Sequence, residues 1–207
     1  APISDKRRLQ KALASDFELP IMDCELSQLR LLQKSLDKAD RQVTAAVYQH
    51  QHIIGIWPGE KKVVYGLAID LGSTTIAAQL CDMNTGDVIA TADTMNPQIR
   101  FGEDLMSRVS YVMMNEGGDV AMTNVVRETF NQLAKRAVKS AGIGLDEILD
   151  ITVVANPIMH HLFLGIDPTE LGGAPFALAV SGSLDFPARE LSLDLHPAAR
   201  TYILPCI

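Results

Sequence analysis

The hydrophobic pattern of the first sixty residues predicts helices followed by two strands. Leucines recur at helical spacing over residues 25–39, and the charged segment 3–13 before them is compatible with a short opening helix. Residues 43–48 and 52–57 are short apolar and β-branched runs, which predict strands. A Pro-Gly-Glu-Lys-Lys segment then ends the pattern. We therefore expect a small, separate domain over residues 1–60.

From residue 61 the pattern predicts a larger domain that begins with three strands. The first of these strands is nearly wholly apolar, which is typical of a central strand. Residues 166–190 are rich in glycine and proline and predict a connection without regular structure. The predicted elements are, in order, strands at 63–70, 75–80 and 88–92, helices from 103 and over 120–141, a strand at 150–155, a helix at 157–164, and candidate strands at 191–195 and 201–204.

This order is β-β-β-α-α-β-α with further strands, and it predicts a mixed sheet with flanking helices. The expected fold class is α/β, or α+β overall. Residues 61–207 would form a ribonuclease-H-like sheet, and the small α/β domain would precede it.

The turn between the first two strands of this domain carries the candidate chemistry. Gly72 allows the backbone to approach a ligand closely, and the amides of Gly72, Ser73 and Thr74 could form a concave set of donors for phosphate. Asp70, at the end of the strand, is placed to hold a hydrated Mg²⁺ ion, which prefers oxygen ligands. The alternative is a plain hairpin in which Asp70 and Ser73 only satisfy turn amides.

Polar side chains also gather after the third strand. Asn96, Gln98, Asp104 and Arg108 are more polar groups than a surface loop needs, and they indicate binding or catalysis. Loop stiffening and helix capping are the alternative. Asn156 follows the strand at 150–155, and ligands of open α/β sheets lie at the carboxyl ends of strands, so Asn156 is a further site candidate.

Histidine and cysteine positions do not predict a metal site. His160 and His161 are adjacent, hence about 100° apart on a helix, and we expect that they cannot both face one ligand. Cys24, Cys81 and Cys206 lie far apart and offer neither a metal-binding pair nor a cluster ligand set. An odd number of distant cysteines fits a reducing cytoplasm.

Composition narrows the function classes. The chain is 47% hydrophobic, enough for a sizeable core, and its formal net charge is −7. This charge disfavours nonspecific binding to nucleic acid or to an anionic membrane surface. No apolar run approaches the roughly 20 residues that span a bilayer. We therefore expect a cytoplasmic protein without nucleic-acid or membrane partners.

Four longer motifs carry a resemblance to a known family. They are GLAIDLGSTTIA at 66–77, NPQ-x-x-FG-x-D-x-x-SR at 96–108, N-x-x-MHHLFLG at 156–165, and DP-x-x-L with a following PF at 167–176. With these motifs the chain resembles the reductive activators of corrinoid proteins, which contain an ATPase domain of the actin-like (ASKHA) superfamily. The resemblance covers essentially the whole chain.

The resemblance implies an organisation and an activity. Residues 1–60 would be the small middle domain, and residues 61–207 the first lobe of the ATPase domain, with the second lobe absent. The full protein would use ATP and Mg²⁺ to drive an electron from a [2Fe–2S] cluster, held on a domain missing from this chain, to Co(II) corrinoid. It would thereby restore Co(I) in the corrinoid protein of a methyltransferase system. A homodimer is possible, and we expect this chain alone to have weak or no ATPase activity.

The resemblance also implies residue roles. Asp70 would orient Mg²⁺-bound water, and Asp104 could order the attacking water. The phosphates would contact the residues of the turn, which are Gly72, Ser73, Thr74 and Thr75. The polar residues after the third strand would line the cleft or communicate with the corrinoid partner; they are Asn96, Gln98, Asp104 and Arg108. Asn156 is a further candidate for cofactor binding.

Two functions of other classes stay open at this point. A small-molecule kinase of the sugar or acetate kinase superfamily would share the fold, but it needs an acceptor pocket with a general base. A non-catalytic domain that docks a partner or dimerises is compatible with the apolar helix at 25–39 and the two strands after it.

Overall fold

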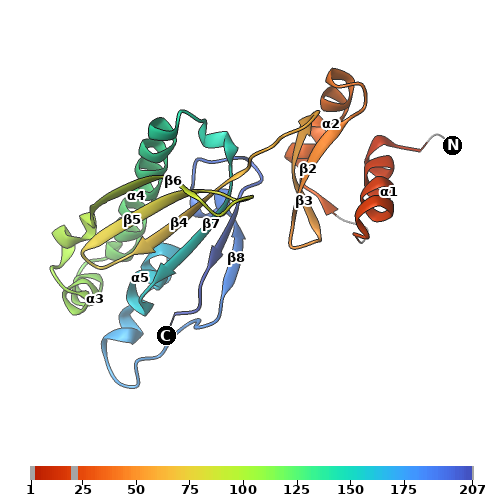
Figure 1. Ribbon diagram of the computed structural model, residues 1–207. Coiled ribbons are helices and arrows are strands. Elements are labelled where there is room, and N and C mark those ends of the chain that lie inside the picture. Colours follow the sequence, from red (N-terminus) through yellow and green to blue (C-terminus); the bar gives the residue numbers. More distant parts are fainter. Residues whose placement is uncertain (1–2, 20–22, 207) are drawn as a thin grey trace. The chain divides into compact units, whose positions relative to one another are not determined.

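The computed structural model describes residues 3–19 and 23–206 and divides the chain into two compact units (Figure 1). The first unit ends at Val64 and the second begins at Tyr65. This division lies close to the boundary that the Pro-Gly segment predicts.

The first unit is a three-stranded sheet with two helices. In the sheet order β1-β3-β2, β1 is parallel to β3 and β2 is antiparallel to it. The structure confirms both predicted strands and both predicted helices. The elements are α1 (Asp5–Phe17), β1 (Asp23–Cys24), α2 (Leu26–Lys38), β2 (Val43–Tyr48) and β3 (His52–Pro58).

The apolar face of α2 packs on the sheet of the first unit. Leu32 and Leu36 join Ile53 and Ile56 of β3 in one buried cluster. Gln28, also on α2, is buried, and its Oε1 accepts a hydrogen bond from the backbone N–H of Ile56 at 2.9 Å. The leucine spacing of the sequence therefore corresponds to the buried stripe of this helix.

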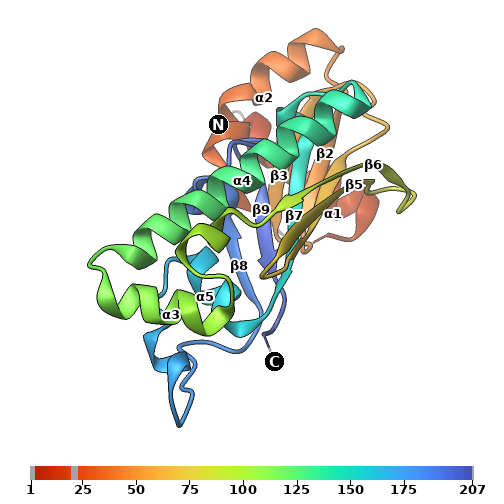
Figure 2. The same ribbon diagram turned by 90° about the vertical axis from the view of Figure 1, so that its left-hand side faces the viewer.

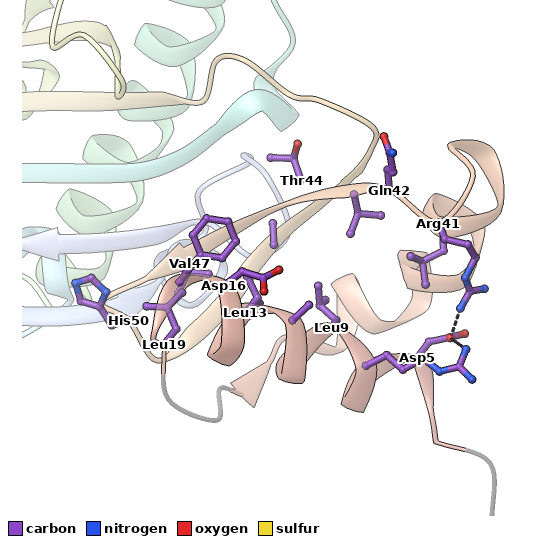
Figure 3. Close-up of a pocket in the computed structure, with 16 residues that line it drawn as sticks. Asp5, Leu9, Leu13, Asp16, Leu19, Arg41, Gln42, Thr44, Val47 and His50 are labelled. Atoms are coloured by element: carbon purple, nitrogen blue, oxygen red, sulfur yellow. Dashed lines mark hydrogen bonds and ion pairs between the residues drawn. The ribbon is translucent and has the colours of Figure 1, made fainter.

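Helix α1 leaves a hollow beside β2. A cavity of about 930 Å³ lies there, and Figure 3 shows Leu9 and Leu13 on α1 and Val47 on β2 among the side chains around it. Asp5 and Arg41, which also line the cavity, form an ion pair (Figure 3). Every residue of β2 is only partly buried as a result.

The second unit contains a six-stranded mixed sheet in the order β6-β5-β4-β7-β9-β8. Strands β4, β5 and β6 form an antiparallel meander, β7 is parallel to β4 and to β9, and β8 is antiparallel to β9. The strands are β4 (Tyr65–Leu71), β5 (Thr75–Asp82), β6 (Val88–Met95), β7 (Ile148–Ala155), β8 (Leu184–Pro187) and β9 (Arg200–Ile203), and the α-helices are α3 (Leu105–Met114), α4 (Gly118–Ala141) and α5 (Pro157–Leu164).

Helices cover one face of this sheet, as Figure 2 shows for α4 and α5. Alternate residues of β4, among them Leu67 and Ile69, point into a core with Phe130 of α4 and Phe163 of α5. The two phenylalanine rings stack with centroids 4.7 Å apart. Ala68 and Asp70, which have the other parity, lie on the opposite face and are exposed. The mixed sheet with flanking helices confirms the predicted fold class.

The segment before β9 differs from the prediction. Residues 191–195 form no strand, and β8 instead lies inside the stretch that was predicted to be irregular. Leu191 and Leu193 are buried, but the backbone between them is held by a side chain: Asn131 donates to Ser192 O at 3.0 Å and accepts from Asp194 N at 2.9 Å. The alternating apolar pattern therefore reflects burial of a turn and not a strand.

Candidate functional site

Asp70 lies at the edge of the sheet where the parallel strands end. It is the penultimate residue of β4, pairs with Ala77 of β5 and Val154 of β7, and is exposed. A hollow of about 370 Å³ on the uncovered face includes Asp70, with Gln79 and Thr152 among its lining. The carboxylate therefore stands in an open depression beside the predicted phosphate turn.

The backbone carbonyls of the turn accept hydrogen bonds from two buried residues, Asn96 and Arg108. Asn96 Nδ2 donates to Gly72 O at 2.9 Å, and Arg108 Nη2 donates to Ser73 O at 2.6 Å. The backbone N–H of Asn96 donates to Thr74 O at 2.7 Å. Asn96 and Arg108 thus fix three successive peptide groups.

This anchoring sets the direction of the turn amides. In a trans peptide the N–H points opposite to the C=O of the same unit. Because the carbonyls of Gly72 and Ser73 point toward Asn96 and Arg108, the N–H groups of Ser73 and Thr74 point away from these two buried side chains. Successive backbone N–H groups that point the same way are a known anion-binding arrangement.

Glycine is required at the start of the turn. A Cβ at Gly72 would stand 2.5 Å from the backbone oxygen of Thr75, which is closer than Cβ atoms approach in proteins. The carbonyl of Thr75 belongs to β5 and cannot move without disturbing the hairpin. Gly72 therefore permits the tight turn itself, as well as any close approach by a ligand.

Arg108 places a buried cation behind the turn. Its side chain is fully buried, its Nε donates to Gly102 O at 3.0 Å, and its Nη1 lies 3.2 Å from the sulfur of Met159. Burial lowers the pKa of Arg108 from its ordinary value, although a guanidinium remains charged at any ordinary pH. The positive charge and the outward amides would both attract an anion at the turn.

Asn96 and Gln98 are internal supports and not surface ligands. Asn96 is 1% exposed and its Oδ1 accepts from Gln98 N at 2.9 Å, while Gln98 is fully buried and donates to Met122 O of α4 at 3.0 Å. With Arg108 they were expected to line the cleft or to communicate with the corrinoid partner. The structure instead encloses all three side chains, because they satisfy backbone carbonyls of the turn and of its neighbours.

Asp104 and Asn156 cap helices. Asp104 is exposed, and its Oδ1 accepts from Ser107 N at 2.7 Å and from Ser107 Oγ at 2.9 Å at the start of α3. These hydrogen bonds lower the pKa of Asp104. Asn156 Oδ1 accepts from Met159 N at 3.0 Å at the start of α5. The capping alternative therefore accounts for the contacts of both residues, and a role in binding or catalysis stays a prediction.

The acceptors Gly102 and Met122 were not predicted from the sequence. A backbone carbonyl carries no side-chain signature, so Met122 offers no signal. Gly102 does offer one, since a Cβ there would stand 2.7 Å from Arg108 N. A glycine six residues before a buried arginine marks the close approach of the two segments.

The expectation about the histidines was wrong. His160, His161 and Cys206 are all buried, and each offers one ligand atom within 4.8 Å of the others. The helical angle of about 100° describes where side chains leave the axis, but long imidazoles can turn back toward a common point. Burial lowers the pKa of His160 and raises the pKa of Cys206, which in each case favours the uncharged form.

Comparison with known families gives both units a match. Residues 65–207 match the family described as RACo middle region, and residues 1–63 match the RACo linker region. The chain belongs to the RACo family. The RACo descriptions thus apply the name linker to the first unit, for which the resemblance suggested the name middle domain, and the name middle region to the second.

Characterised relatives of this RACo chain are corrinoid activators. It is 26% identical over 211 residues to the corrinoid activation enzyme RamQ of Eubacterium limosum, covering 93% of this chain and 36% of that enzyme. It is 28% identical over 111 residues to the [Co(II) methylated amine-specific corrinoid protein] reductase of Methanosarcina barkeri, covering 54% of this chain and 19% of the reductase. The chain therefore spans about a third or less of these relatives.

A solved structure agrees with this assignment. A reductive activator for corrinoid, iron-sulfur protein superposes with a TM-score of 0.86 at 32% sequence identity, covering 99% of this RACo chain and 33% of the other. Among the described residues, no helix combines the length and the apolar character that crossing a membrane requires.

Proposed function

We propose that this RACo chain supplies the phosphate-binding half of an ATP site in a reductive activator of corrinoid proteins. The observation that supports it most is the turn after β4, whose carbonyls are bound by Asn96 and Arg108 so that the amides of Ser73 and Thr74 point away. A plain hairpin needs no buried guanidinium behind it. The exposed carboxylate of Asp70 beside the turn completes the set of groups that a magnesium–phosphate ligand uses.

The residues divide into contacts and supports. Gly72, Ser73, Thr74 and Thr75 would contact the phosphates, and Asp70 would hold Mg²⁺ through its waters. When bound, Mg²⁺ neutralises phosphate charge. Asp104 is retained as the group that would order the attacking water.

A second set of residues would act through the turn. We assign Asn96, Gln98 and Arg108 as positioning residues because their side chains are buried and engaged with the backbone. Asn156 follows Ala155, which pairs with Leu71 in the neighbouring strand, and it would lie at the same edge as the phosphates.

The activity of the full protein follows its relatives. We propose that ATP binding and hydrolysis drive a conformational change that lets one electron pass from a [2Fe–2S] cluster to Co(II), giving Co(I). The cluster would be held outside this chain, and the corrinoid protein of a methyltransferase system would be the partner. The site would be cytoplasmic, a homodimer is possible, and neither nucleic acid nor membrane would take part. The chain alone would show little ATPase activity.

The test is substitution of Asp70 in the full-length protein. Asp70→Ala should abolish ATP-stimulated reduction of Co(II) corrinoid, followed by the absorbance of Co(I). Asp93→Ala is the matched control, because Asp93 is an exposed carboxylate on β6 of the same sheet. Unchanged stimulation in Asp70→Ala would contradict the assignment. Phosphate transfer from ATP to a metabolite, tested over a panel of sugars and carboxylic acids, would favour a kinase instead.

A further inference from the structure

A second candidate site lies beneath an exposed loop of the second unit. His160 and His161 belong to α5, and Cys206 follows β9, which brings these residues together although they are distant in sequence. The three residues are 0%, 1% and 2% exposed, respectively, and one ligand atom from each lies within 4.8 Å of the other two. The nucleotide proposal uses none of them.

The imidazole ring of His160 is buried without a hydrogen-bond partner in the described part of the chain. Neither Nδ1 nor Nε2 has a partner among the described residues. A neutral imidazole carries one N–H donor and one lone pair, and leaving both unsatisfied in the interior costs free energy. Its neighbours in the cluster offer a thiol and a second imidazole. A ligand that takes a lone pair from each would satisfy the acceptor nitrogen of His160 and relieve that part of the cost.

His161 has the tautomer that a metal-binding histidine needs. Its Nδ1 lies 2.8 Å from the carbonyl oxygen of Pro157, which can only accept, so Nδ1 carries the proton. The lone pair is then on Nε2, which accepts from the backbone N–H of Ala179 at 3.1 Å. A backbone carbonyl that fixes the tautomer in this way is the usual second partner of a histidine ligand.

The loop that contains Ala179 also makes a hydrogen bond with Cys206. The thiol of Cys206 donates to the carbonyl of Val180 at 3.4 Å, and Val180 follows Ala179. Thus two adjacent loop residues hold the ligand atoms of His161 and Cys206. Ala179 is itself exposed, so part of the loop that contacts the cluster faces solvent.

We propose that His160, His161 and Cys206 form a binding site for a divalent transition metal of the Zn²⁺ type. Two imidazoles and a thiolate select Zn²⁺ over Mg²⁺, which prefers oxygen. Zinc bonds of about 2.0 Å to nitrogen and 2.3 Å to sulfur place neighbouring ligand atoms about 3.5 Å apart, so the side chains must close by about an ångström. Water would complete the tetrahedron.

Metal binding would change the protonation of the site and the contacts of the loop. The thiol of Cys206 gives up its proton to solvent and binds as thiolate, and no electron is transferred. His161 Nε2 leaves the N–H of Ala179, and Cys206 leaves the carbonyl of Val180. The loop around Ala179 and Val180 therefore loses two of its attachments when the metal binds.

The experiment uses Co²⁺ as a spectroscopic probe for the purified chain after chelator treatment. We expect one Co²⁺ per chain, a thiolate-to-cobalt charge-transfer band, and loss of that band when Zn²⁺ is added. Cys206→Ser should remove the band, and His160→Gln should weaken binding by roughly tenfold or more. Cys81→Ser is the matched control, because Cys81 is a free cysteine of β5 outside the cluster.

A second measurement uses only the unmodified chain, so it does not depend on whether the variants fold. In the unmodified chain, Zn²⁺ should raise the thermal midpoint and speed hydrogen exchange at the amide of Ala179. Absence of stoichiometric metal binding to the unmodified chain would overturn the proposal. A cobalt band that persists in folded Cys206→Ser, or that disappears in Cys81→Ser, would overturn it as well.

Discussion

The turn after β4 and the cluster beside α5 both contain buried polar side chains, but they use them in opposite ways. Asn96 and Arg108 donate hydrogen bonds to backbone carbonyls of the turn and of Gly102. In the cluster, His160 is equally buried and has no partner among the described residues. Polar side chains that already make hydrogen bonds hold the backbone in place, whereas a polar side chain without a partner remains able to bind a ligand. The two regions therefore predict opposite responses to substitution.

The largest effect should come from Arg108→Met. This change leaves the carbonyls of Ser73 and Gly102 without their donors, and each unsatisfied buried group costs about 1–3 kcal/mol. We expect a loss of about 3 kcal/mol in the free energy of unfolding, measured with urea, and loss of nucleotide binding by the full-length protein. A stability within 1 kcal/mol of the unmodified chain would show that these hydrogen bonds do not hold the turn.

Asp150 offers an intermediate case, because one of its carboxylate oxygens is also buried without a partner in the described chain. Burial and, next, the charge of Asp185 raise its pKa from 3.8 to about 6. A carboxyl that binds its proton more tightly in the folded state stabilises the fold at low pH. This contribution, about 3 kcal/mol for a shift of this size, is lost as the pH rises from about 4 to 6.

Unfolding free energies measured between pH 4 and pH 7 check this, with Asp150→Asn as the comparison. The asparagine variant should lack that part of the pH dependence. An identical pH profile in both proteins would show that Asp150 does not titrate in this window.

Asp104 separates capping from catalysis. Asp104→Ala removes the cap of α3 and should cost about 1 kcal/mol, whereas Asp104→Ser keeps a capping oxygen and should cost less. If the carboxylate orders water, both variants lose ATP hydrolysis in the full-length protein. Hydrolysis that follows stability across the two variants would leave Asp104 as a cap only.

The smallest effect should come from His160→Leu in chelator-treated protein. Since the ring of His160 makes no hydrogen bond within the described chain, the unfolding free energy should change by less than about 1 kcal/mol. With Zn²⁺ present the unmodified chain should become the more stable of the two. A large loss in the metal-free state would mean that His160 has a partner and that the comparison fails.

Much of this architecture could be predicted from the sequence. The bounds of β2 match the prediction, and the helix that was expected from Val120 begins two residues earlier, at Gly118. Periodicity succeeds here because one face of each element is buried. It failed at residues 191–195, where Asn131 holds a turn that buries alternate leucines.

The surroundings of the candidate site residues were predicted from the sequence less completely than the fold. Asp70 and the turn were singled out because a glycine and hydroxyl residues follow an apolar strand, and their role in binding stays a prediction. The burial of Gln98 and Arg108 was not found, since polar residues near a proline and a glycine resemble a surface loop. The meeting of His160 with Cys206 depends on how β9 passes α5, which no local pattern records.

The bond from Arg108 to Ser73 has a mechanical consequence. Arg108 belongs to α3, so one guanidinium couples that helix to the turn. Met106, Met113 and Met114 stand exposed on the same helix. Because Arg108 donates to Ser73 O, a shift of α3 at those methionines would move the backbone of the turn, and a change in the turn would in return move α3.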